Sequence, residues 1–263
     1  MKFMTIRSGS NANCIYINNR DYGILIDVGV GIRNVQSALK QIDTDLSHIA
    51  AIFITHEHVD HIRGLSSITK KYKIPIFANA ATCDAIHDRM PDVDCGLFVE
   101  MPTGRDAVCP DLKVTSYKTS HDAVESVGYT VTDGKRRISI ATDLGIVTQT
   151  VLEHVRCSDA IILESNYDEN MLRNGIYPPT LKQRILSSHG HLSNNDCAIT
   201  ATALAAGGTK RLILGHLSEN NNLPMLAYNT TLAALKNSNI KVGRDVLLSV
   251  ASREICSEYM EVL

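Results

Sequence analysis

A predicted strand and a histidine cluster meet in the stretch Ile49-Ala50-Ala51-Ile52-Phe53-Ile54-Thr55-His56-Glu57-His58-Val59-Asp60-His61. Its first six residues are apolar and rich in β-branched and aromatic side chains, which is typical of a buried strand. Because side chains alternate along an extended chain, His56 and His58 point to the same side just past the strand end. Asp60 and His61 follow as the chain turns and can face a second point nearby. Imidazole and carboxylate together suit zinc, manganese or iron, so the stretch predicts a metal site rather than a polar loop that contains histidines by chance.

The composition is that of an ordinary globular protein. The 263 residues are 44% hydrophobic and 21% charged, which is enough for a sizeable core. The net charge of −2 gives no general attraction for nucleic acid, so a phosphate-rich partner would have to be held by local charge and by metal ions. Seven cysteines are scattered without a CxxC pair, which indicates reduced thiols rather than disulfides or a zinc knuckle. The sequence has no run of 18 apolar residues and no signal-peptide core at its N-terminus, so we expect a cytoplasmic protein without a membrane partner.

Strand and helix patterns alternate along the chain, and no low-complexity linker separates them, so we expect a single domain over residues 1–263. Within residues 3–26 we predict strands, and later strands are predicted at 49–54, 74–78, 113–119, 128–132, 137–142, 160–163, 211–214, 246–251 and 254–259. Helices are predicted at 32–42, 65–72, 82–89, 147–155, 180–187, from Ser193 or Asn194 to 206, and at 224–236. Residues 167–179 have the pattern of an irregular loop.

Several predicted strands are followed by a residue that can bind metal. His121 follows the strand at 113–119, Asp143 ends the strand at 137–142, and His216 follows the strand at 211–214. The ends of such strands line a shared edge of an α/β sheet. Together with the first cluster, they give seven candidate ligands: His56, His58, Asp60, His61, His121, Asp143 and His216. Since a catalytic ion needs three protein ligands, seven divides into two sets of three and one shared carboxylate, which predicts two ions roughly 3.5–4 Å apart.

This ordered set of motifs, together with the early Asp27, resembles the metallo-β-lactamase superfamily over essentially the whole chain. The resemblance implies an α/β fold, a four-layer αβ/βα sandwich. It implies one ion on His56, His58 and His121, a second on Asp60, His61 and His216, and Asp143 as the bridge between them. Asp27 is then a structural acid that orients the metal loop, with ligation as the alternative. A bridging aspartate, in place of a cysteine, is similar to the phosphodiesterase and nuclease branches.

Four further motifs resemble the YycJ/WalJ-like branch, which is associated with 5′→3′ exonuclease action on DNA. They are SGSNANC at 8–14, TSHDA at 119–123, ESNYD at 164–168 and GHLSN at 190–194. The resemblance implies a metal-dependent hydrolase with two divalent ions, zinc or manganese with iron also acceptable, and DNA as the preferred substrate. RNA, a small cyclic phosphodiester, and a thioester of the glyoxalase II type stay open as substrates. A non-catalytic nucleic-acid-binding module is the alternative of another class.

His191 resembles the phosphate-contacting histidine of the family, and we expect it and Asp60 to take part in the reaction. A leaving oxygen needs a proton or a hydrogen bond, which an imidazole can supply. The alternative for His191 is a helix-capping role, and we expect His189 to be exposed and unimportant. Glu164, at the end of a predicted strand, has only a weak indication of a role near the site.

Two other features have open interpretations. The loop at 8–13 either offers amides and small polar side chains to a phosphate or is an ordinary tight turn. The basic clusters at 70–73 and 135–137 are either solvated faces or contacts for DNA, because phosphate binding needs several such charges on one side.

Overall fold

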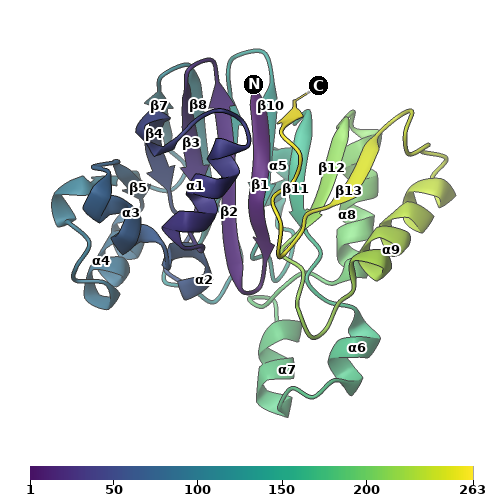
Figure 1. The fold of residues 1–263 in the computed structure, drawn as a ribbon. Helices are drawn as coiled ribbons and strands as arrows, with labels where there is room; N and C mark the ends of the chain where they lie inside the picture. Colours follow the sequence, from purple (N-terminus) through teal and green to yellow (C-terminus); the bar gives the residue numbers. More distant parts are fainter. Residues whose placement is uncertain (263) are drawn as a thin grey trace.

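Two β-sheets lie face to face, with helices on both outer sides (Figure 1). This computed structural model describes residues 1–262. The first sheet contains, in spatial order, β14 (Met260–Glu261), β1 (Lys2–Gly9), β2 (Ala12–Asn19), β3 (Tyr22–Ile26), β4 (Ile49–Phe53), β5 (Ile76–Ala78) and β6 (Phe98–Glu100). The second contains β13 (Leu247–Val250), β12 (Arg211–Gly215), β11 (Ala160–Glu164), β10 (Arg137–Ala141), β9 (Val127–Thr132), β8 (Leu112–Lys118) and β7 (Asp106–Cys109).

The helices follow the strands that they cover. Along the first sheet they are α1 (Ile32–Lys40), η1 (Leu46–His48), α2 (Val59–Ile62), α3 (Leu65–Lys71), α4 (Ala80–Arg89) and η2 (Cys95–Leu97). Along the second they are α5 (Gln149–Val155), α6 (Glu169–Asn174), α7 (Pro179–Leu186), α8 (Asn194–Ala206) and α9 (Pro224–Asn237). Within residues 1–262, no helix combines the length and the apolar character needed to cross a bilayer.

Three apolar clusters lie between the layers. The central cluster joins the two sheets; in it the Phe53 ring of β4 meets the Tyr129 ring of β9 edge to face at 5.6 Å. A second cluster packs Val35 of α1 and Ile68 of α3 against the outer face of the first sheet, and a third packs Leu204 of α8 in the same way against the second sheet. The order helix, sheet, sheet, helix confirms the predicted four-layer αβ/βα sandwich.

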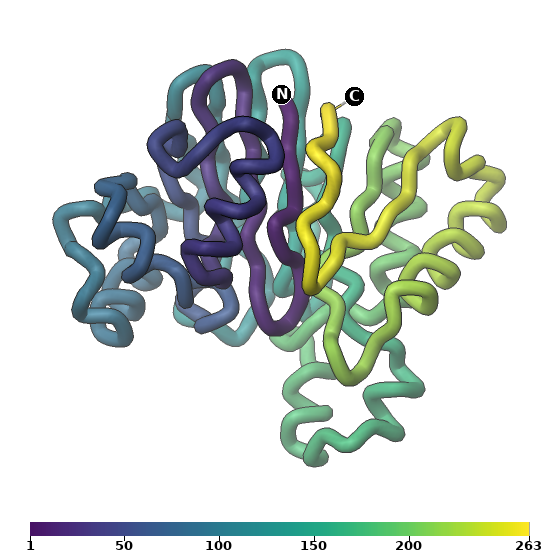
Figure 2. The backbone as a smooth tube through the Cα atoms, viewed as in Figure 1, coloured from purple at the N-terminus to yellow at the C-terminus, as the bar shows by residue number. Residues whose placement is uncertain are grey.

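The parallel strands determine where the site forms. β3, β4, β5 and β6 run parallel, as do β10, β11, β12 and β13. Their continuous apolar runs, such as Ala160–Glu164 with every residue buried, are typical of strands covered on both faces. The chain's two ends meet where β14 pairs with β1, Lys2 lying opposite Glu261 (Figure 2). The C-terminal ends of the parallel strands therefore gather at one edge, away from both termini.

Two of the predicted elements are wrong. Residues 167–179 are not an irregular loop, because the Asp168 side chain accepts a hydrogen bond from the Met171 amide at 2.9 Å and starts α6. The predicted strand at 254–259 is not formed; β14 begins at Met260 instead. Both errors come from segments too short for a periodic pattern to separate helix, strand and loop.

Candidate metal centre

All seven predicted ligands converge where the C-terminal edges of the two sheets meet. From the first sheet, His56 and His58 follow β4, and Asp60 and His61 lie in the short helix α2. From the second sheet, three residues follow alternate strands: His121 after β8, Asp143 after β10 and His216 after β12. The separate motifs of the sequence thus form one cluster with members from both sheets.

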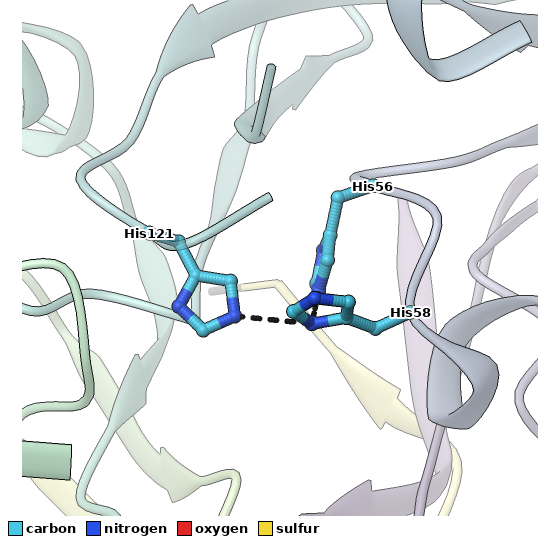
Figure 3. Close-up of side chains that lie close together, drawn as sticks. All are labelled: His56, His58 and His121. Carbon is cyan, nitrogen blue, oxygen red and sulfur yellow. Dashed lines mark hydrogen bonds between the residues drawn. The ribbon is translucent and has the colours of Figure 1, made fainter. Parts of the chain in front are cut away.

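The first group consists of His56, His58 and His121, which point toward a common centre (Figure 3). The distance from His56 Nε2 to His58 Nδ1 is 3.0 Å, and that from His121 Nε2 to the same Nδ1 is 3.3 Å. Burial lowers the pKa of all three imidazoles, so they stay neutral and keep the lone pairs that a metal needs.

The second group consists of Asp60, His61 and His216, whose ligand atoms also lie within 4.8 Å of one another. The Asp60 Oδ2 atom lies 3.3 Å from His61 Nε2. Burial of His216, opposed by the Asp143 charge, lowers the pKa of this imidazole to about 4. This mixture of nitrogen and oxygen donors suits zinc or manganese.

Asp143 lies between the two groups. Its Oδ1 is 3.3 Å from His216 Nε2 and 3.6 Å from His121 Nε2, and its Oδ2 is 3.5 Å from His61 Nε2. Burial alone would raise the pKa of Asp143, but the surrounding imidazoles lower it well below its ordinary value, so the carboxylate is ionised. Within residues 1–262, the buried Oδ2 has no hydrogen-bond partner. A buried anionic oxygen without a partner is costly, and a cation would satisfy it, so the residues present fit divalent metal binding.

Polar groups behind the ligands fix the orientation of three histidines. Nδ1 of His61 lies 2.8 Å from Asp27 Oδ2, Nδ1 of His216 lies 3.2 Å from Asn13 Oδ1, and Nδ1 of His121 lies 3.0 Å from the Gly190 carbonyl oxygen. An acceptor on Nδ1 keeps the proton there and leaves Nε2 free for a metal. Asp27 also accepts hydrogen bonds from the Thr55 amide and hydroxyl, which is the structural position that the family resemblance implies for it.

Replacing Asp27 with asparagine is expected to lower the metal affinity of the second ligand group more than that of the first. The amide loses one of the acceptor positions that now serve three donors, so His61 is less firmly oriented; such outer partners typically contribute about 10–100-fold in metal affinity. Competition with a chromophoric chelator measures both affinities. The control is Asp111→Asn, on an exposed carboxylate that pairs with Arg20. Equal affinities in the variant and the wild type would contradict this role.

The backbone is strained where three residues of the site leave their strands. Asp27, Asp143 and His216 have φ angles of 57°, 59° and 55°, a left-handed region that is uncommon outside glycine. Gly29 lets the chain pass close to the metal loop, since a Cβ atom there would lie 1.6 Å from the Asp60 carbonyl oxygen. The conformation that presents the ligands is therefore held by the surrounding packing.

His191 borders the two groups and is paired with a residue whose role the sequence indicated only weakly. Its Nδ1 lies 2.7 Å from Glu164 Oε1, and its ring stacks on His216 at 5.3 Å. Burial lowers the pKa of His191, but the Glu164 carboxylate outweighs it and the pKa lies above the ordinary value. Glu164 is the last residue of β11, so the rule that ligands follow strand ends could have found it. His191 does not cap α8, because Ser193 does.

The other indicated features fall in different places. The segment 8–13, predicted to be a loop, instead forms the paired ends of β1 and β2 with a two-residue turn at 10–11. It borders the second group: Ser8 Oγ accepts from the His216 amide at 2.9 Å, and Asn13 contacts Asp60. His189 is exposed, as expected.

The basic clusters are largely occupied by other contacts. In the cluster at 70–73, Lys70 and Lys73 pair with Asp92 and Asp94. In that at 135–137, Arg137 donates to the His154 carbonyl oxygen. Neither cluster lines the cavity at the metal centre.

The comparisons with known proteins agree with this geometry. The family described as "Beta-lactamase superfamily domain" matches residues 22–217. The chain is 32% identical to the exodeoxyribonuclease YycJ of Bacillus anthracis, with 92% of each chain covered. It is also 32% identical to the exodeoxyribonuclease WalJ of Streptococcus pneumoniae serotype 2, over 99% of this chain and 98% of that protein.

Among solved structures, the metallo-beta-lactamase fold protein YhfI of Bacillus subtilis superposes with a TM-score of 0.73 at 15% identity, over 97% of this chain and 98% of that one. At this identity the likeness concerns the fold alone. The resemblance to the YycJ/WalJ-like branch is confirmed by the two relatives at 32% identity. The chain belongs to the beta-lactamase superfamily.

Proposed function

We propose that this metal-dependent hydrolase is a phosphodiesterase that uses two metal ions and degrades DNA from the 5′ end. The observation that carries the proposal is the pair of three-residue ligand groups with the ionised Asp143 between them. Two divalent ions held by adjacent ligand groups would supply the chemistry that is typical of enzymes that cleave phosphodiesters. DNA as substrate is supported by the two relatives named exodeoxyribonucleases, and the 5′→3′ polarity by the resemblance to their branch.

When bound, the ions supply Lewis acidity, which lowers the pKa of water and offsets the charge of a phosphoryl group. The chain contributes the ligands: His56, His58 and His121 for one ion, Asp60, His61 and His216 for the other, and Asp143 for both. Three of these imidazoles are already oriented by acceptors on Nδ1, so little rearrangement is needed on binding.

His191 and Glu164 form the proton-donating part of the site. Glu164 accepts a hydrogen bond from His191 Nδ1, which leaves Nε2 to face the cavity that His191 lines. Because the carboxylate raises the pKa of the imidazole, His191 is suited to donate a proton to the oxygen that leaves phosphorus. Asp60 lines the same cavity and contributes charge as well as a ligand atom.

The cavity suits one linkage of an extended strand. Its volume is about 220 Å³, and its lining includes Ser10 and Asn11 of the turn between β1 and β2 and residues of the helix α7. With two divalent ions the cavity would carry a net positive charge against the Asp60 and Asp143 carboxylates. That charge attracts a phosphodiester, which is anionic at the reacting group, more strongly than a thioester linkage, which carries no charge there.

End-labelled single- and double-stranded DNA and RNA, offered in parallel with manganese and with zinc, test this function. We expect mononucleotides released successively from the 5′ end of DNA, with RNA cleaved less efficiently. A glutathione thioester offered to the same preparation provides the comparison of kcat/KM. A higher kcat/KM for the thioester would contradict a phosphodiesterase, and DNA binding without turnover would favour a binding module.

A further inference from the structure

The helices α6 and α7 form a hairpin, residues 169–186, that projects from the body of the fold beside the metal centre (Figure 1). It has its own small apolar cluster, which contains Tyr167, Leu172 and Ile185 with Tyr177, Leu181 and Leu186 packed against it. A hydrogen bond also connects it to the site. Asn220, in the loop that follows His216, donates to the Tyr177 hydroxyl at a distance of 3.0 Å. The hairpin is therefore a separately packed element at the rim of the cavity.

The hairpin contributes four of the residues that line the cavity: Tyr177, Leu181, Arg184 and Ile185. Arg184 is the only lysine or arginine among the lining residues that the structure describes. Its side chain is 49% exposed, so it is accessible to a ligand in the cavity.

Asp122 fixes the guanidinium of Arg184. Nε of Arg184 donates to Asp122 Oδ2, and Nη2 donates to Oδ1 at 2.9 Å. The same Oδ1 lies 3.5 Å from Nε2 of His121. A guanidinium has five N–H donors, and these two contacts leave three of them for a ligand. One carboxylate thus separates Arg184 from the ligand set, which places the free donors beside the metal position and not on it.

We propose that the α6–α7 hairpin holds the nucleic acid strand, with Arg184 on the phosphate next to the scissile one and the Tyr177 ring against a base. The inference rests on the proposed function and names the residues that bind its substrate. Arginine is suited to a phosphate because its planar donors match the phosphate oxygens. An aromatic ring stacks on any base, as an enzyme that digests a strand of arbitrary sequence requires. Asp122 is a positioning residue that acts through Arg184.

The test compares Arg184→Ala with Lys182→Ala in the manganese-loaded enzyme. Both variants remove one positive charge from α7, but Lys182 Nζ donates to the Arg173 carbonyl oxygen and lies outside the cavity. For a single-stranded DNA oligonucleotide, Arg184→Ala should raise KM about tenfold, change kcat by less than about twofold, and reduce the salt slope of binding by about one. Lys182→Ala should match the wild type. Melting temperature and metal content show whether each variant is folded and loaded.

A small substrate shows whether Arg184 contacts the neighbouring phosphate or the scissile one. Bis(p-nitrophenyl) phosphate has no neighbouring phosphate, so the fold-loss caused by Arg184→Ala should be much smaller on it than on the oligonucleotide. Equal losses on this substrate and on the oligonucleotide would place Arg184 at the scissile phosphate and overturn the assignment. Equal KM values for Arg184→Ala and Lys182→Ala would also overturn it, while leaving the nuclease function intact.

Variants of Tyr177 test the stacking role, and a binding measurement without turnover tests affinity directly. Tyr177→Phe keeps the ring and should retain the oligonucleotide KM, whereas Tyr177→Ala should raise it several-fold; identical values would remove the stacking role. Fluorescence anisotropy of a labelled oligonucleotide, measured in a His191→Ala background, should show the same order of affinities. If the wild type neither cleaves nor binds nucleic acid, the proposed function is wrong and the inference fails with it.

Discussion

Asp143→Asn is expected to contain at most one tightly bound metal ion per chain and to lose at least about 10³-fold in kcat/KM on DNA, since shared charge stabilisation in such sites is worth several kcal/mol. The carboxylate lies within 3.6 Å of nitrogen atoms from both ligand groups, and its Oδ2 has no other partner within residues 1–262. An amide is neutral and offers one acceptor oxygen where the carboxylate offers two. Elemental analysis of the purified variant, together with steady-state cleavage, measures both effects.

Asp106→Asn is the matched control, because this carboxylate is on an exposed strand of the same sheet and pairs with Lys113 at 2.7 Å. It should retain two ions and full activity. If Asp143→Asn also retained two ions and wild-type kcat, the shared position assigned to this residue would be wrong. A loss of both ions with an unchanged circular dichroism spectrum would support it, since each group would have lost part of its charge.

His191→Ala is expected to reduce kcat on DNA about 10²–10⁴-fold while metal content stays at two, because proton donation by a positioned side chain contributes this much. Glu164→Gln should have a smaller effect and should move the pH profile. The carboxylate raises the pKa of His191, so removing its charge lowers that pKa. Since the donor must be protonated, the alkaline limb of kcat should move to lower pH. Rates measured from pH 5 to pH 10 show the shift.

A DNA substrate with a p-nitrophenyl leaving group provides the control for the donor. Its leaving oxygen needs no proton, so His191→Ala should cleave it at close to the wild-type rate. An equal loss on both substrates would assign His191 to phosphate binding instead. His189→Ala, two residues away and exposed, should behave as the wild type with either substrate.

The sequence predicts the ligand set because each ligand has a local signal. The apolar run before His56 identifies a strand, and the same pattern before Asp143 and His216 places them at the same edge. The four-layer order follows from the alternation of elements and the family resemblance, and the structure confirms it. Assignment of each residue to an ion stays a prediction, supported by the distances within the two groups.

The parts that sequence could not predict depend on contacts between distant segments. Asn13 orients His216, which lies 203 positions later in the sequence, and Glu164 accepts a hydrogen bond from His191, 27 positions later. Contacts between residues so far apart produce no local sequence pattern. The α6 helix is six residues long, too short for periodicity to distinguish it from a loop. The position of α7 at the rim of the cavity, which brings Arg184 to Asp122, depends on contacts between distant segments.

Each ligand group contains residues from both sheets, so a bound cation would cross-link the two halves of the sandwich. An ion that binds only the folded chain, at a hundred times its Kd, contributes about 2.7 kcal/mol to the free energy of unfolding. Heat tolerance and resistance to proteases should therefore rise and fall with cation supply. In a starved cell the protein would be degraded sooner, and its abundance would report on the availability of the metal that it uses.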